Sequence, residues 1–149
     1  MNGEDIKFMK LALKMAKKAA SLDEIPVGAV LVRDGIVRQK AFNLTKSNKL
    51  KHAEKIVLEN ELLQGEKLLH DYTLYSTLEP CCMCAGIIIL SRVGRVVYGC
   101  ADPKGGAVNS VYTILSDGKL NHSPKLTKGV LREESSKLLK TFFKKKRIL

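Results

Sequence analysis

The sequence contains no tryptophan, only four cysteines and no apolar run long enough to cross a membrane. Its longest apolar run, at 86–90, falls far short of the roughly 20 residues that a membrane-spanning helix needs. The first five residues include two acids, and no uninterrupted apolar segment follows them. We therefore expect no signal peptide, no membrane partner and a cytoplasmic location.

The few cysteines are clustered rather than dispersed. Three of the four lie at 81, 82 and 84, whereas a disulfide framework would spread them along the chain. In a reducing compartment such a cluster more often binds a metal ion. Cys100 stands apart, and we interpret it as a small buried apolar residue.

Positive charge is plentiful and uneven. The net charge is +11, and residues 125–149 contain nine basic side chains against two acidic ones. A concentrated positive field attracts polyanions such as nucleic acids, although a solvated tail would have the same composition. Charge alone leaves these two interpretations open.

The length of 149 residues fits one domain, 1–149, of the α/β class. Apolar periodicity predicts helices at 4–20, 52–64, 80–91 and 131–146, and strands at 27–32, 36–42, 72–76, within 93–100 and at 125–130. Asp34-Gly35 predicts a hairpin turn, and Pro80 is expected as a first helical residue. Segment 101–123 is irregular, with a short helix expected near 111–115. This alternation predicts a mixed sheet covered by helices, a three-layer α/β/α domain.

Two fragments contain the residues for chemistry: His52-Ala53-Glu54 and Pro80-Cys81-Cys82-Met83-Cys84. Cys81 and Cys84 share the first turn of a predicted helix, where exposed N–H groups favour thiolates. With His52 they supply three ligands for one Zn²⁺ per chain. A fourth position stays open for water, as in catalytic rather than structural zinc sites.

Glu54 is the predicted proton shuttle. Two residues after His52 on a regular helix it would point away from the metal, so we expect His52 at an irregular helix start. Two alternatives stand beside this hypothesis. The cysteines could be buried thiols with a polar helix start nearby, or a fourth ligand from Cys82 or Cys100 could complete a structural zinc site. Cys82 is expected to point about 100° away from Cys81 around the helix.

H-x-E followed by P-C-x-x-C is typical of zinc-dependent nucleobase deaminases, in which zinc-activated hydroxide attacks the amine-bearing carbon. Nearly the whole chain resembles the bacterial tRNA adenosine deaminases. The similarity lies in segment 24–30, both zinc motifs within 52–54 and 77–86, segment 91–99, and residues at 102–107, 121–122 and 142–143. Residues 48–51 depart from the family, which usually has Asp-Pro-Thr-Ala before its His-Ala-Glu motif.

The resemblance implies a cytidine-deaminase-like fold, a homodimer, and conversion of the wobble adenosine of a tRNA anticodon to inosine. It further implies that Asn43 contacts the flipped purine and that Asp102 and Lys104 lie near the anticodon-loop backbone. Simple turn roles are the alternative for all three residues.

The last predicted helix combines a terminal basic run with an apolar stripe. We expect Lys144, Lys145, Lys146 and Arg147 to contact tRNA phosphates. Leu138, Leu139 and Phe142 are expected to anchor the helix to the core. Two other functions remain open: deamination of a free base or nucleoside, and a nucleic-acid-binding module with a structural zinc.

Overall fold

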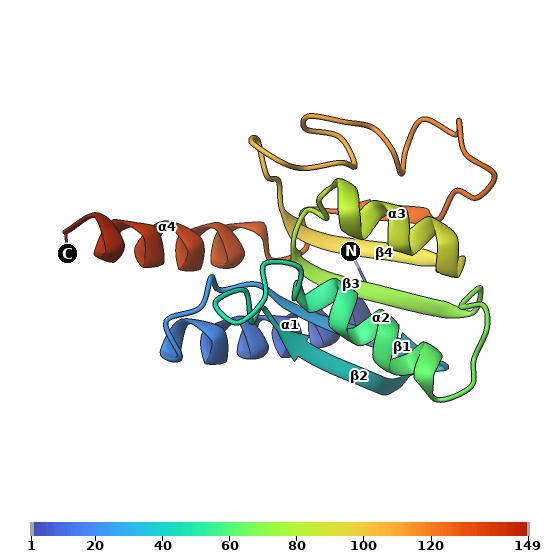
Figure 1. Ribbon diagram of the computed structural model, residues 1–149, viewed down its shortest axis with the longest axis horizontal. Coiled ribbons are helices and arrows are strands. Elements are labelled where there is room, and N and C mark those ends of the chain that lie inside the picture. Colours follow the sequence, from blue (N-terminus) through green and yellow to red (C-terminus); the bar gives the residue numbers. More distant parts are fainter. Residues whose placement is uncertain (1, 149) are drawn as a thin grey trace.

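A five-stranded sheet lies between two pairs of helices in the computed structural model, which describes residues 2–148 (Figure 1). The elements in chain order are α1 (Gly3–Ser21), β1 (Gly28–Arg33), β2 (Ile36–Phe42), α2 (Ala53–Leu63), β3 (Tyr72–Leu78), α3 (Cys82–Ser91), β4 (Arg95–Cys100), β5 (Lys125–Lys128) and α4 (Arg132–Ile148). Helices α2 and α3 cover one face, and α1 and α4 the other. In the described part of the chain, every helix is too short or too polar to span a bilayer.

The sheet is mixed, with the strand order β2-β1-β3-β4-β5. Strand β1 is antiparallel to both of its neighbours, while β3, β4 and β5 run parallel. The parallel pair β3 and β4 is joined through α3, so the carboxyl ends of both strands meet at one edge of the sheet. The predicted three-layer α/β/α fold is confirmed.

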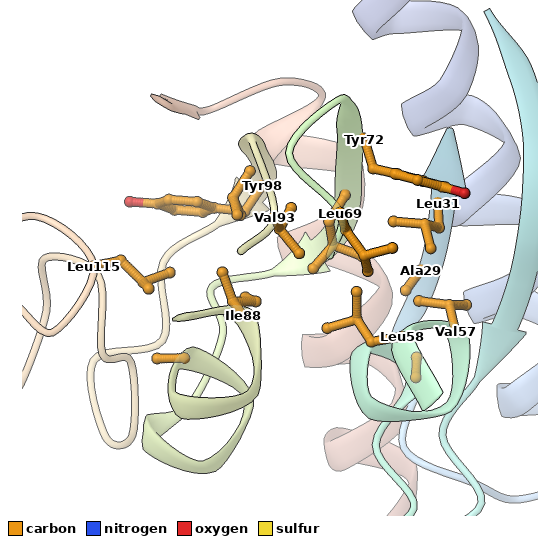
Figure 2. Packing of buried hydrophobic residues seen from close by; sticks show 14 of the residues in the cluster. Ala29, Leu31, Val57, Leu58, Leu69, Tyr72, Ile88, Val93, Tyr98 and Leu115 are labelled. Atoms are coloured by element: carbon orange, nitrogen blue, oxygen red, sulfur yellow. The ribbon is translucent and has the colours of Figure 1, made fainter. Parts of the chain in front are cut away.

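Alternate residues of the central strands fill two cores. Ala29 and Leu31 of β1 belong to the core beneath α2 and α3, which Figure 2 shows. Val30 and Val32 belong to the core beneath α1. Burial on both faces explains why β1 is a continuous apolar run rather than an alternating one.

Two local features confirm the expected hairpin and helix packing. Asp34 and Gly35 both have positive φ, 51° and 73°, the geometry of a tight hairpin turn. At Gly28, an added Cβ would lie 2.0 Å from the carbonyl oxygen of Ala12 in α1. Only glycine therefore lets α1 approach β1 this closely.

The prediction that Pro80 is the first helical residue is wrong. Helix α3 begins at Cys82, and Cys81 is its N-cap with extended backbone angles. The Pro80 carbonyl accepts a hydrogen bond from the Ala107 N–H at 2.8 Å, and Cys81 forms a bridge with Gly106. Pairing with the distant loop therefore holds 80–81 extended and delays the helix.

The short helix expected near 111–115 is also absent from the described chain. The N–H groups of Val111 and Tyr112 both bond to the Gly106 carbonyl, at 2.9 and 3.1 Å. These bonds tie residues 111 and 112 back to Gly106 in a turn-like arrangement. The loop conformation is set by contacts with residues far away in sequence, which local periodicity does not reveal.

Helix α4 contacts the sheet chiefly through its first turns. Ser135 is buried, and its Oγ lies so close to Gly99 of β4 that a Cβ there would be 2.5 Å away. Leu138, Leu139 and Phe142 are only half-buried, although Leu139 does pack against the core. The expected apolar anchor is therefore weaker than predicted, and the rest of α4 extends beyond the sheet (Figure 1).

Candidate active site

A cavity of about 660 Å³ opens where the carboxyl ends of β3 and β4 meet. Its walls include the segment before β1, the end of β3, the loop before α2, the start of α3, the loop after β4, and α4. Crevices outside the carboxyl ends of parallel strands are the usual ligand sites of α/β folds. His52, Glu54 and Cys81 all line this cavity.

His52 lies at the N-cap of α2, with extended backbone angles of −78° and 145°. Its side chain makes no capping hydrogen bond, so the imidazole is free to face the cavity. The oxygen of the Asn43 amide replaces it and accepts a hydrogen bond from the Ala53 N–H at 2.8 Å. The predicted irregular start at His52 is confirmed, and it lets Glu54 face the same cavity as the imidazole.

The two expected thiol ligands lie together at the start of α3. Cys81 is the N-cap and is half-buried, and Cys84 is fully buried one turn further on. Cys82 is exposed, as its angular position predicts, and Cys100 is buried in β4. The exposed N–H groups of this helix end favour negative charge on sulfur.

The three expected ligand atoms have the spacing of a tetrahedral zinc site. His52 Nδ1 lies 3.6 Å from Cys81 Sγ and 3.7 Å from Cys84 Sγ, and all three atoms lie within 4.8 Å of one another. Zinc bonds of about 2.05 Å to nitrogen and 2.3 Å to sulfur, at tetrahedral angles, imply a separation of about 3.6 Å. In residues 2–148 no fourth His, Cys or carboxylate joins this group. The residues fit a three-ligand zinc site.

The charges at this site also suit a cation. Hydrogen bonds with Cys84 and with the adjacent His52 together lower the pKa of Cys81 to about 4, although burial opposes this. The bond between the two cysteines and burial raise the pKa of Cys84. A divalent cation would favour the thiolate form of both residues, because metal binding releases protons from thiol ligands.

Glu54 is buried beside these ligands with an unsatisfied oxygen. Only 4% of the residue is exposed, and Oε1 has no hydrogen-bond partner in the described chain. Burial raises the pKa of Glu54 to about 7. A carboxyl with such a pKa can both accept and donate a proton near neutral pH. An unpaired buried oxygen at a cavity wall is otherwise costly, which suggests that a ligand completes its contacts.

The expected substrate-side residues divide into two groups. Asn43, Asp102, Lys104 and Arg147 line the cavity, whereas Lys144, Lys145 and Lys146 do not. Lys146 instead forms an ion pair with Asp23, at 2.5 Å.

Asn43 and Asp102 have the local structural roles that the alternative interpretation gives them, and they also line the cavity. Asp102 Oδ1 accepts bonds from the N–H groups of Lys104 and Gly105, and Asn43 caps α2 as described above. The Asn43 amide nitrogen, by contrast, has no protein partner within residues 2–148. Asn43 and Asp102 therefore both shape the wall and face the cavity.

Phe143 and Glu79 also line the cavity, and no motif in the sequence predicts a site role for either residue. Phe143 is 40% exposed. Glu79 is 1% exposed, and burial raises its pKa, but N–H donors from Asn109, Asp102 and Ser110 outweigh this and lower it. Glu79 precedes the zinc motif directly, yet its partners follow 23 or more residues later. The motif alone contains no signal for that network.

A mixed α/β/α fold with one histidine, two cysteines and a buried glutamate at the sheet edge defines a zinc-dependent hydrolytic deaminase. The family described as “Cytidine and deoxycytidylate deaminase zinc-binding region” matches residues 2–100. The chain belongs to this family. The expected cofactor, one zinc ion per chain, agrees with both the family and the ligand geometry.

Among curated relatives, the tRNA-specific adenosine deaminase of Haemophilus influenzae is 48% identical over 148 residues, covering 96% of this chain and 85% of that protein. The tRNA-specific adenosine deaminase of Bacillus subtilis is 43% identical over 147 residues, covering 97% and 91%. A solved structure from work on A-to-I editing by tRNA:A34 deaminases has a TM-score of 0.84 at 41% identity, covering 89% and 99%. The expected resemblance to tRNA adenosine deaminases is confirmed.

Proposed function

We propose that this protein converts the wobble adenosine of a tRNA anticodon to inosine, with water as co-substrate and ammonia as second product. The observation that carries the proposal is the cavity itself. It joins the His52, Cys81 and Cys84 group and Glu54 to a wall formed by α4, and its rim includes basic side chains. The relatives named above support the same substrate.

The chemistry follows from the position of Glu54. When bound by His52, Cys81 and Cys84, zinc supplies Lewis acidity that brings the pKa of a water close to 7. Glu54 accepts a proton from the attacking water and delivers it to N1 of the purine. It then takes the second proton of that water from the hydroxyl formed on C6 and transfers it to the amine, so that the C6–N bond breaks, ammonia leaves and the C6 carbonyl of inosine forms. Burial keeps the pKa of Glu54 near 7, which suits both transfers.

Basic residues at the cavity favour RNA over a free base. Lys49, Lys104, Lys140 and Arg147 line the cavity, and they come from three different segments. A free base carries no phosphate, so it would gain nothing from four cations around its site. In an RNA substrate, the phosphates of the nucleotides that flank the target base would neutralise these four cations. We propose that Asn43 contacts the purine through its free amide nitrogen and that Asp102 lies near the loop backbone.

A structural zinc site is the less favoured alternative. Such sites have four protein ligands, but Cys82 points to solvent and Cys100 lies in β4. The described ligand group contains three residues beside a cavity. This geometry favours catalysis by a single domain, 1–149, as the sequence predicts. The predicted cytoplasmic location stays a prediction.

We further propose that two copies form a homodimer through the face that carries α2 and α3. Leu63 of α2 and Leu90 of α3 are 82% and 78% exposed, and the two helices lie side by side (Figure 1). Tyr112, in the loop after β4, is also largely exposed. Sedimentation of the wild type and of Leu90→Glu tests this: the variant should dissociate, and a monomeric wild type would refute the proposal.

The substrate is tested with an anticodon stem-loop that has adenosine at the wobble position. We expect inosine at that position and one ammonia released per inosine. A matched stem-loop with guanosine at the wobble position, and adenosine elsewhere in the loop, should give no product. Free adenosine, guanine and cytosine complete the comparison. Faster release of ammonia from a free base than from the stem-loop would overturn the proposal.

A further inference from the structure

Glu79 is enclosed by one loop of the protein. Its carboxylate accepts hydrogen bonds from the N–H groups of Asp102 and Val108, both at 3.0 Å, of Asn109 at 2.9 Å and of Ser110 at 3.1 Å, and from the Ser110 hydroxyl. Both oxygens are engaged: Oε1 accepts from the Asp102 N–H and the Ser110 hydroxyl, and Oε2 accepts from the N–H groups of residues 108–110. Segment 102–110 thus closes around a single buried side chain.

The same loop packs against the metal-ligand segment. A Cβ on Gly106 would lie 2.3 to 2.5 Å from the carboxyl atoms of Glu79. Gly106 also forms the bridge with Cys81, and the next residue, Ala107, donates to the Pro80 carbonyl at 2.8 Å. The loop therefore lies against both the glutamate and the start of the zinc motif.

The start of this loop is part of the cavity wall. Asp102, Pro103 and Lys104 line the cavity, and the Asp102 N–H is the donor to Glu79 Oε1. Asp102 in turn accepts bonds from Lys104 and Gly105. Glu79 therefore holds Asp102, and Asp102 in turn holds the part of the loop that faces the cavity.

We propose that Glu79 is a positioning residue for the RNA substrate, holding loop 102–110 so that Asp102 and Lys104 face the cavity. This inference rests on the proposed function, because an RNA loop is the ligand to be positioned. Glu79 lies outside the ligand group of His52, Cys81 and Cys84, and donors from loop 102–110 occupy both of its carboxylate oxygens. Its effect should therefore appear in KM for the stem-loop and leave kcat and zinc content little changed.

Glu79→Gln is the sharpest variant because it keeps size and changes one oxygen to an NH₂ group. If the amide oxygen keeps the three N–H donors at Oε2, the new NH₂ faces the Ser110 hydroxyl, which can rotate to accept, and the Asp102 N–H, which cannot. Two donors then oppose each other, and the start of the loop is released. We expect KM for the stem-loop to rise about tenfold, the size of losing one or two such contacts.

Two adjacent glycines supply a matched pair on the other side of the contact. Gly106→Ala places a Cβ against Glu79 and should reproduce the rise in KM with Glu79 intact. Gly105→Ala meets only Asp102 Oδ2 at 3.4 Å, an ordinary contact, and serves as the control. If Gly106→Ala fails to fold, the comparison of Glu79→Gln with Gly105→Ala still tests whether Glu79 positions the loop.

Two measurements on the zinc-loaded enzyme test the proposal. Hydrogen exchange of the Asp102 amide, without substrate, should become faster in Glu79→Gln, and exchange of the amides at 102 and 108–110 should become faster in Gly106→Ala. Gly105→Ala should change neither. Steady-state kinetics per zinc-loaded site should show the KM rise in Glu79→Gln and Gly106→Ala. Unchanged exchange, or an unchanged KM with lowered kcat, would overturn the proposal. If the wild type does not deaminate the stem-loop, the proposed substrate is wrong, and the exchange data still decide whether Glu79 holds the loop.

Discussion

At the residue scale, Glu54 combines two opposed properties. It is buried with one unpartnered oxygen, which destabilises the fold, and it lies beside the proposed metal ligands, which its chemistry requires. A residue selected for stability alone would not leave a carboxyl in this state. Residues that lower the stability of the fold but are required for its chemistry are common at functional sites.

Glu54→Gln separates these two properties. We expect zinc and fold to be retained, and turnover to fall by about 10² to 10⁴, the usual contribution of a proton-transferring group. The thermal midpoint should stay level or rise, because the variant removes a buried group that ionises. Glu59→Gln, on the exposed face of the same helix, is the matched control. Wild-type turnover in Glu54→Gln would show that the shuttle is another residue.

The cysteines provide a second prediction at this scale. Cys81→Ala and Cys84→Ala should lose the zinc ion, because each removes one of three ligands. Cys82→Ala and Cys100→Ala should keep it, since the first thiol is exposed and the second lies in β4. Zinc content of the purified proteins is the measurement. Loss of zinc from Cys82→Ala would favour a structural site instead.

At the scale of secondary structure elements, a buried ion pair joins α1 to the sheet. Asp5 of α1 accepts two hydrogen bonds from the Arg95 guanidinium of β4, at 2.8 and 2.6 Å, and one from the Tyr75 hydroxyl at 2.8 Å. Arg95 also donates to Thr127 of β5 at 2.9 Å. The bonds from Arg95 lower the pKa of Asp5, despite its burial.

This pair predicts part of the acid sensitivity of the fold. A depressed pKa stabilises the folded state above the unfolded pKa, near 3.8, and the contribution is lost as pH falls through the folded value. Asp5→Asn should lower the unfolding free energy by about 3 kcal/mol near pH 7, because Arg95 loses its partner. The difference from wild type should shrink below about pH 4. Asp34→Asn, in the exposed hairpin turn, is the control, and a pH-independent difference would contradict this account.

The sequence predicts the proposed zinc ligands better than it predicts where α3 begins. The ligands were predictable because H-x-E and C-x-x-C are local patterns with a fixed chemical meaning. The start of α3 was not, since Pro80 is held by Ala107, a residue 27 positions later. Glu79 was missed for the same reason. Long-range hydrogen bonds fix loop 102–110, and no periodicity in the sequence records them.

At the scale of the whole molecule, the cavity unites parts that are distant in the chain. Residues from the loop before α2, from the loop after β4 and from α4 form its walls. Asp23, after α1, pairs with Lys46 of the first of these segments and with Lys146 of α4. These contacts are exposed, and salt screens such pairs. The basic end of α4 is therefore held near the cavity by weak, replaceable interactions.

The four expected phosphate contacts consequently differ in their surroundings. Arg147 lines the cavity, Lys144 and Lys145 are exposed, and Lys146 is already paired with Asp23. Phosphate contacts release counterions, so each lost contact should reduce the salt dependence of binding by about 0.7 in log–log slope for a single-stranded loop. We expect the largest effect from Arg147→Gln and the smallest from Lys146→Gln, because the Lys146 ammonium must first leave Asp23.

Neutralising all four residues to glutamine should weaken binding of the anticodon stem-loop and flatten its salt dependence, while zinc content stays unchanged. The fold should survive, because the contact of Ser135 with Gly99 lies more than two turns before the basic run. The measurement is Kd at several salt concentrations. The control neutralises four exposed lysines of α1 that do not line the cavity: Lys10, Lys14, Lys17 and Lys18. Equal losses in both quadruple variants would mean that net charge alone attracts the RNA. A loss confined to the α4 variant would assign the contacts to that helix, and no loss in either would leave the tail solvated and weaken the case for tRNA.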